Sequence, residues 1–407
     1  MKRTYNVGSL FAGVGGICLG FKNAKFNMSS YNIEWANEMD EYACETYRNN
    51  FEHNLIQGDL EKLVNPEIID EDILGLKEEF KDIDDEKNYN IKLEILNDEK
   101  KYYIEKNNKI LDESLDILVG GFPCQPFSLA GNRLGFEDRR GNLFYTIMSL
   151  IDKLKDKPQV VFLENVKNLK THDKGNTYKV MEQELINRGY SVKSEVLNTM
   201  NYSNIPQNRE RIFIVAFLDS KKSEKFTLFD RLNEIKNTST IEERKEDIKK
   251  ILDLSINKKD NEKYYYTKEK YPNYFLSEDD YENLPKEKRK SERVNIDEQI
   301  TEELSFYQVR RGMYVRQNKS GVCPTLTANM GTGGHNVPLI KVKDGVRKIT
   351  PKEAFKLQGF PVGEGYVLPE FYKNKPYSDA RLYKQAGNAV TVAVIELIAE
   401  EILKALE

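Results

Sequence analysis

The stretch that decides the fold class is Leu115-Asp116-Ile117-Leu118-Val119-Gly120-Gly121, which continues directly into Phe122-Pro123-Cys124-Gln125-Pro126-Phe127-Ser128. Its apolar first part predicts a buried parallel strand that the two glycines interrupt. Each proline excludes helical geometry for the residue before it, so Phe122 and Gln125 should be extended. Cys124 is therefore expected on a stiff loop at the C-terminal end of a strand, where ligands bind in open α/β sheets.

The chemistry of Cys124 has two interpretations. A lone cysteine is commonly a small buried hydrophobic residue. The rigid, polar-flanked Pro-Cys-Gln-Pro setting is a poor core element, however, and it favours a reactive thiol. The other cysteines, Cys18, Cys44 and Cys323, form no CxxC pair. This scatter argues against a metal site or a disulfide framework and for a reducing compartment.

Length and composition limit the class of protein. A chain of 407 residues predicts two domains, or one domain with insertions. We read no signal peptide and no apolar run long enough to span a membrane, so a cytoplasmic protein is expected. The net charge of -4 does not by itself suggest a nucleic-acid partner, but such binding depends on a local basic face.

The N-terminus predicts a nucleotide-type cofactor site. A strand over 5–11 is followed by the turn Ala12-Gly13-Val14-Gly15-Gly16 and a helix over 17–26. The glycines permit close approach to the backbone, and the helix N-terminus offers free N–H groups. The spacing departs from GxGxxG, so a dinucleotide is not the first choice, and many such turns bind nothing.

Acidic residues follow the next two predicted strands. Glu38 comes after a strand over 31–36, about 20 residues past the glycines, where a carboxylate binds ribose hydroxyls. Asp40 suits the N-cap of the following helix. Asp59 ends a short strand that starts at Leu55, and its carboxylate could meet an adenine amino group.

Polar residues in the middle of the chain complete the predicted site. Glu164 closes the apolar strand 160–163, so its carboxylate should lie on the same sheet edge as Cys124. Arg209 and Arg211 alternate at the start of a strand and suit an anion or a base edge, with a surface salt bridge as the competing interpretation. The glycine-rich segment 131–141 predicts a lid.

Two charge-rich segments and a later segment of mixed polar and aromatic residues stand out from the rest of the chain. The segments 61–113 and 221–303 are rich in charge and predict solvated insertions. Residues 307–318 interleave arginine, glutamine and asparagine with aromatics, which are side chains suited to reading base edges. Thr350, Pro351 and Glu353 predict the capped start of a helix.

Six segments in this order resemble the cytosine-5 DNA methyltransferase family, of the bacterial restriction-modification type. They are Phe11 to Gly16, Phe122 to Gln125, Glu164 to Val166, Gln207 to Arg211, Leu357 to Pro361 and Gly387 to Val390. The resemblance implies an α/β fold with a doubly wound, mostly parallel sheet and a smaller, irregular target-recognition domain. The expected divisions are a catalytic domain over 1–220, a recognition domain over 221–345, a hinge over 346–384 and a returning C-terminal helix over 385–407.

The resemblance also implies S-adenosylmethionine as cofactor. Its expected contacts are Phe11, Ala12, Gly13, Val14, Gly15, Gly16, Glu38, Met39, Asp59, Leu60, Pro123, Leu143, Asn388 and Ala389. Two positions depart from the family pattern. Met39 stands where relatives often have an aromatic residue, and Ala389 where some have serine.

The implied reaction fits the chemistry of cytosine. Carbon 5 is a poor nucleophile, so a Cys124 thiolate must first add to carbon 6. Glu164 would hold N3 and protonate it, Arg211 would contact the base carbonyl or the thiolate side, and Arg209 a phosphate or loop. The target base must rotate out of the duplex to reach the site, as it does in DNA methyltransferases generally.

Double-stranded DNA is the implied substrate, with a restriction endonuclease as a functional partner, no membrane and a monomeric state. The expected DNA contacts are Gln125, Ser128, Arg133, Arg139, Arg310, Arg311, Arg316, Gln317, Thr325 and Thr327. Two alternatives stay open: a tRNA methyltransferase on the same catalytic core, and a catalytically silent DNA-binding member. The many base-reading side chains after residue 300 favour DNA, and the complete set of site residues favours catalysis.

Overall fold

The computed structural model describes residues 3–81, 83, 85–123, 143–289, 293–310, 314–332 and 336–407. Its larger part is built on an eight-stranded sheet with the order β2-β3-β1-β5-β6-β8-β7, in which β4 also pairs with β3. The strands are β1 (Thr4–Leu10), β2 (Lys25–Phe26), β3 (Ser29–Glu38), β4 (Asn54–Gln57), β5 (Ile117–Gly121), β6 (Val160–Val166), β7 (Ser191–Asn198) and β8 (Glu210–Phe217).

The pairing confirms the predicted mostly parallel sheet. β4, β3, β1, β5 and β6 pair in parallel, whereas β8 is antiparallel to both β6 and β7. β2 adds a short antiparallel edge to β3. The parallel strands therefore present their C-terminal ends at one edge, which is the edge where the sequence placed the site.

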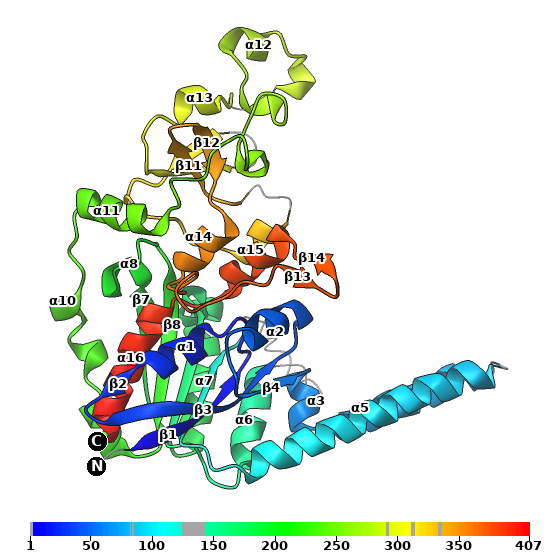
Figure 1. Ribbon diagram of the computed structural model, residues 1–407. Coiled ribbons are helices and arrows are strands. Elements are labelled where there is room, and N and C mark those ends of the chain that lie inside the picture. The colour runs from blue at the N-terminus through cyan, green and yellow to red at the C-terminus, as the bar shows by residue number, and fades with distance from the viewer. Residues whose placement is uncertain are drawn as a thin grey trace.

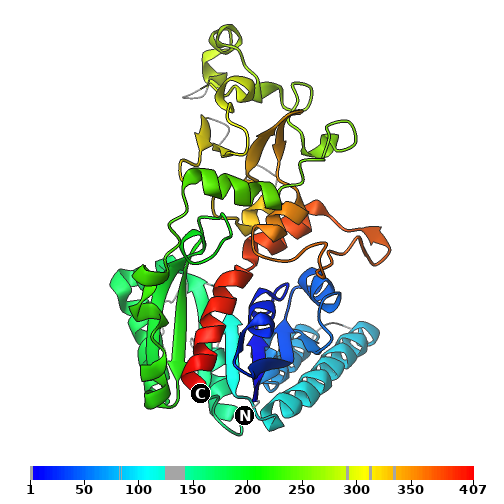
Figure 2. The same ribbon diagram turned by 60° about the vertical axis from the view of Figure 1, so that its left-hand side comes forward.

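Helices cover both faces of the sheet, because neighbouring strand residues point to opposite sides. In β5, Ile117 and Val119 join one buried cluster, whereas Leu118 joins the other. The helices are α1 (Gly16–Asn23), α2 (Glu41–Arg48), α3 (Leu60–Val64), α6 (Leu143–Lys153), α7 (Asn176–Asn187), α8 (Thr199–Tyr202) and α16 (Val392–Leu406). The last helix, α16, brings the end of the chain back to the large sheet and lies along it, close to the N-terminal strand (Figure 2).

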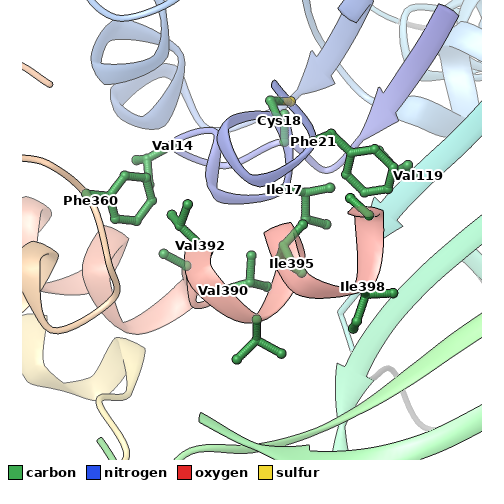
Figure 3. Close-up of a cluster of buried hydrophobic side chains, with 14 of the residues drawn as sticks. Val14, Ile17, Cys18, Phe21, Val119, Phe360, Val390, Val392, Ile395 and Ile398 are labelled. Carbon is green, nitrogen blue, oxygen red and sulfur yellow. The ribbon is translucent and has the colours of Figure 1, made fainter. Parts of the chain in front are cut away.

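The packing of α16 against α1 fixes the two ends of the chain together. Ile17 and Phe21 of α1 face Val392, Ile395 and Ile398 of α16 in one apolar layer (Figure 3). All five side chains are buried, and each contributes about 1.5–3 kcal/mol relative to an exposed position. This layer lies directly under the glycine turn that precedes α1.

The first charged segment forms an arm of two helices, α4 (Ile68–Glu79) and α5 (Glu86–Asp112). α5 projects far from the sheet (Figure 1). Salt bridges Lys92–Glu79 and Lys100–Asp70 join the two helices. Only Tyr103 and Ile110 of α5 are buried, so the arm is a solvated extension anchored at its base.

A second sheet, of order β10-β9-β11-β12, forms the core of a smaller part of the chain above the first (Figure 1). Its strands are β9 (Phe306–Arg310), β10 (Tyr314–Gln317), β11 (Leu339–Val342) and β12 (Gly345–Lys348). The helices around and below it are α11 (Ile241–Ile251), α12 (Glu278–Glu282), α13 (Ile296–Gln299), α14 (Pro351–Lys356) and α15 (Asp379–Asn388). Before them, α9 (Ser220–Lys225) packs against α16, β7 and β8 of the large part, and α10 (Leu232–Ile235) follows it. A hairpin, β13 (Phe371–Tyr372) and β14 (Lys375–Pro376), precedes α15.

Two predicted helix starts are confirmed. The Asp40 side chain accepts hydrogen bonds from the N–H groups of Tyr42 and Ala43 at the start of α2. Thr350 and Glu353 form the capping box of α14. Within the described residues, no helix is long and apolar enough to cross a membrane.

Candidate active site

A cavity of about 530 Å³ opens at the C-terminal edge of the large sheet. The order of the strands sets the order of the residues along it: Asp59 follows β4, Glu38 ends β3, the glycine turn follows β1, Pro123 follows β5 and Glu164 lies near the end of β6. The predicted cofactor residues that line it are Phe11, Ala12, Gly13, Val14, Gly16, Glu38, Met39, Asp59, Leu60, Pro123, Leu143, Asn388 and Ala389. Glu164, Arg209 and Arg211 line the same cavity.

The glycine turn requires glycine at Gly15, which caps the N-terminus of α1. Its φ of 87° lies in the left-handed region, and an added Cβ would stand 2.2 Å from the Phe51 ring. Gly15 itself is not among the residues that line the cavity. It shapes the turn, whereas Gly13 and Gly16 form the wall.

Glu38 is held by the backbone around it. Its carboxylate accepts hydrogen bonds from the N–H groups of Gly13 at 2.8 Å, Met39 at 2.9 Å and Asp40 at 2.8 Å. Burial raises the pKa of Glu38, although these donors act in the opposite direction. The carboxylate thus ties the end of β3 to the glycine turn, and about one of its four acceptor sites remains for a ligand.

Asp59 is positioned by the charged arm. Its side chain caps α3 by accepting from the Glu61 N–H at 2.7 Å, and its own N–H donates to Tyr103 Oη at 2.8 Å. The neighbouring Tyr102 hydroxyl donates to the carbonyl of Gln57 at 3.1 Å. The charge pattern of the arm predicted only a solvated insertion, whereas Tyr102 and Tyr103 at its base hydrogen-bond the turn that carries Asp59.

Lys384 and Asn165 are site residues that the sequence reasoning missed. Lys384 of α15 lines the cavity and pairs with Asp40 at 3.0 Å. Burial raises the pKa of Asp40, but the bond and charge of Lys384 together with the N–H groups of Ala43 and Tyr42 outweigh it, and the net shift is downward. Asn165 donates to the carbonyl of Phe122 at 3.0 Å and so holds the residue two places before Cys124.

Cys124 lies outside the described residues, as does the predicted lid. β5 and β6 pair with Gly121 beside Glu164, which puts the start of the Cys124 loop next to the acid. A Cβ at Gly121 would stand 3.2 Å from Glu164 Oε2, so any larger residue would crowd this carboxylate.

Glu164 and Arg211 form a buried ion pair, with Arg211 Nε 3.0 Å from Glu164 Oε1. Burial raises the pKa of Glu164, and the positive charges of Arg211 and Arg209 act against it. Burial lowers the pKa of Arg211, while Glu164 acts against that shift. The competing interpretation of Arg211 as a surface salt bridge is wrong, because both side chains are largely inaccessible to solvent.

Arg209 joins three segments that are distant in sequence. Its guanidinium donates to the carbonyls of Leu326 at 2.8 Å, Ala389 at 2.6 Å and Gly387 at 3.3 Å. The side chain is 2% exposed, and burial followed by the charge of Arg211 lowers its pKa. Arg209 therefore joins the start of β8 to the segment around Leu326 and to the end of α15.

The predicted DNA contacts divide into three groups. Gln125, Ser128, Arg133, Arg139 and Arg311 lie outside the described residues. Arg310 and Arg316 lie on the β9–β10 hairpin, and Thr327 is exposed beside α15. The Gln317 amide donates to Glu302 at 2.8 Å, and the Thr325 hydroxyl donates to the carbonyl of Asn208 at 2.6 Å, so both are engaged within the protein.

The described residues hold no group of three or more side chains suited to a metal ion. Cys18, Cys44 and Cys323 are buried free thiols. Burial raises the pKa of all three, to about 12 for Cys44. These three thiols are therefore poor nucleophiles.

Comparisons with known proteins identify the family. Residues 5–76 and 84–404 match the model of the C-5 cytosine-specific DNA methylase family. The chain is 41% identical over 403 residues to the type II methyltransferase M.Bsp6I of Bacillus sp. (strain RFL6), covering 98% of this chain and 99% of that one. It is 33% identical to the type II methyltransferase M.HaeII of Haemophilus aegyptius, covering 99% and 94%.

Solved structures agree on the fold. The Dnmt2 methyltransferase of S. pombe superimposes with a TM-score of 0.55 at 15% identity, covering 98% of both chains. The methyltransferase EhMeth of Entamoeba histolytica gives the same score at 17% identity, covering 100% of this chain and 99% of that one. The resemblance expected from the six sequence motifs is confirmed, and the chain belongs to the C-5 cytosine-specific DNA methylase family.

Proposed function

We propose that this DNA cytosine-5 methyltransferase moves a methyl group from S-adenosylmethionine to carbon 5 of a cytosine rotated out of duplex DNA, through a covalent bond between Cys124 and carbon 6. One observation carries this proposal: the residues expected to bind the cofactor and those expected to activate the base line the same cavity. The Glu164–Arg211 pair lines it together with the glycine turn and Glu38, and Pro123, the neighbour of Cys124, stands at the same wall.

The residues of the cavity fit S-adenosylmethionine. Glu38 retains an acceptor site for a ribose hydroxyl, and Asp59 stands beyond it for the adenine amino group. Met39 is 67% exposed at the cavity, so its thioether is available to cover the adenine where relatives often have an aromatic ring. Asn388 would hold the amino-acid end, and Ala389, Pro123 and Leu143, which line the same cavity, would contribute further contacts. When bound, the cofactor supplies an electrophilic methyl group.

The protein residues would activate the base. The Cys124 thiolate adds to carbon 6, and protonated Glu164 donates its proton to N3, so that carbon 5 becomes nucleophilic. Its burial favours the protonated acid. After carbon 5 accepts the methyl group, it loses its proton to a base such as water, and the electrons of that C–H bond re-form the double bond between carbons 5 and 6. The carbon–sulfur bond breaks, the Cys124 thiolate leaves, and N3 returns its proton to Glu164. Arg211 orients Glu164 and the carbonyl side of the base.

The rest of the chain would select the DNA. We assign the catalytic domain to 1–220, recognition to 221–345, the hinge to 346–384 and the returning helix to 385–407. The type II names of the relatives support a role beside a restriction endonuclease, whose cleavage the methyl group would block. Sequence choice is placed in 305–338, where the arginines of β9 and β10 lie.

Covalent trapping tests the proposal. With DNA that carries 5-fluorocytosine, carbon 5 cannot lose a proton, so the adduct should persist on a denaturing gel. We expect the wild-type chain and Cys18→Ala to form it, because Cys18 is buried and does not line the cavity. Cys124→Ala should form no adduct and no 5-methylcytosine while still binding the cofactor. Turnover by a clean Cys124→Ala preparation would disprove the covalent mechanism.

A further inference from the structure

The β9–β10 hairpin has one apolar and one polar face. Tyr307, Val309 and Val315 pack into a cluster of the smaller part of the chain. The antiparallel register pairs Arg316 with Gln308 and Tyr314 with Arg310. Residues two apart in a strand share a face. The polar face is therefore formed by Gln308, Arg310, Tyr314 and Arg316.

The polar face lies on the side of the small sheet that packs toward the large part of the chain. Phe306 shares a face with Gln308, and it packs into the large cluster that includes Leu326 and Met330. The carbonyl of Leu326 accepts from Arg209, which lines the cavity. The apolar face lies on the opposite side of the small sheet, against the cluster around Val294 and Ile296.

Gln308 holds the side chain of Arg310. Gln308 is 7% exposed, and its Oε1 accepts a hydrogen bond from Arg310 Nη2 at 2.5 Å. The guanidinium is a planar fork with five donors, so one bond to Gln308 fixes its plane and leaves the other donors for a ligand. Arg310 is only half-buried and Arg316 is exposed.

We propose that Arg310 and Arg316 each read a guanine from the major groove, and that Gln308 is the positioning residue for Arg310. A two-stranded ribbon fits this groove, and arginine pairs bidentately with guanine O6 and N7. The inference rests on the proposed function and deepens it. The proposal assigns base reading to Arg316 and not to its neighbour Gln317, which lies on the opposite face and donates a hydrogen bond to Glu302.

Methylation sequencing tests the proposal. Each variant is expressed in a host without its own cytosine methylation, and the methylated sequences are read from total DNA. We expect Arg310→Ala, Arg310→Lys and Arg316→Ala to lower the preference for one guanine each, by roughly 5- to 150-fold. Gln308→Leu should relax the same position as Arg310→Ala. Gln308→Glu keeps an oxygen acceptor and should retain the preference.

The controls separate this proposal from the activity itself. Lys343→Ala, in the turn between β11 and β12, should leave the methylated sequence unchanged. Unchanged specificity in the Arg310 and Arg316 variants overturns the proposal, as does a loss of specificity in Gln317→Ala equal to that in Arg316→Ala. An absence of 5-methylcytosine with the wild-type chain would instead contradict the proposed function. Cofactor affinity, measured by calorimetry, identifies any variant that has not folded.

Discussion

Arg211 Nε lies 3.0 Å from Glu164 Oε1, yet the two groups do not have hydrogen-bond geometry. Among the described residues, this buried oxygen has no hydrogen-bond partner. A buried oxygen that makes no hydrogen bond is uncommon, so such an atom at a candidate active site indicates a place for a ligand. Glu164 Oε1 thus lies beside Arg211 and keeps hydrogen-bonding capacity that a base could use.

Arg211→Gln should shift the pH dependence of methyl transfer. The charge of Arg211 favours ionised Glu164, so its removal raises the pKa of Glu164 further. Glu164 then stays protonated to higher pH, so the alkaline limb of the plot of kcat against pH should shift to higher pH. Single-turnover rates across the pH range in which the protein stays folded measure this limb. A limb at the same pH in wild type and variant would exclude the coupling.

Glu164→Gln should lower kcat by about 100-fold or more, because the amide keeps the shape of the side chain but cannot donate the proton. Cofactor affinity should change little, since Glu164 is expected to face the base. Calorimetry and single-turnover assays on the same preparation separate the two effects. A variant that loses cofactor affinity and rate together would place Glu164 in cofactor binding instead.

Tyr103→Phe should weaken cofactor binding by roughly 2- to 10-fold, as expected for one lost hydrogen bond. The variant leaves the Asp59 N–H without its acceptor and loosens the turn that carries the carboxylate. Tyr89→Phe, at the far end of the same arm, is the matched control. Equal affinities of the two variants would show that the arm does not support the site.

Gly387→Ala should destabilise the protein, whereas Gly75→Ala should not. Both glycines lie in helices, but a Cβ at Gly387 would stand 2.1 Å from the carbonyl carbon of Thr327, and one at Gly75 would meet no atom within 4 Å. Overpacking costs about 1–3 kcal/mol, and alanine in an open helix position contributes about 0.5–1 kcal/mol. Thermal unfolding of both variants measures the difference, and equal melting temperatures would contradict it.

Much of the fold follows from short-range patterns. Apolar runs bounded by glycine predict the parallel strands, and Asp40 and Thr350 predict the starts of the helices that they cap. These patterns are readable because each acts over only a few residues. Lys384 gives no such signal. Its partner Asp40 is 344 positions away, and no local pattern connects the two.

The sequence by itself determined the family, the reaction class and the order of the site residues along the sheet edge. The apolar run Leu115 to Val119 also predicted the strand that precedes Cys124. Only the tertiary structure decided that Arg209 clamps Leu326 to Ala389, that the charged arm supports Asp59, and that Arg316 and Gln317 face opposite ways. Motifs specify which groups are present, whereas long-range pairing and strand register decide which groups meet.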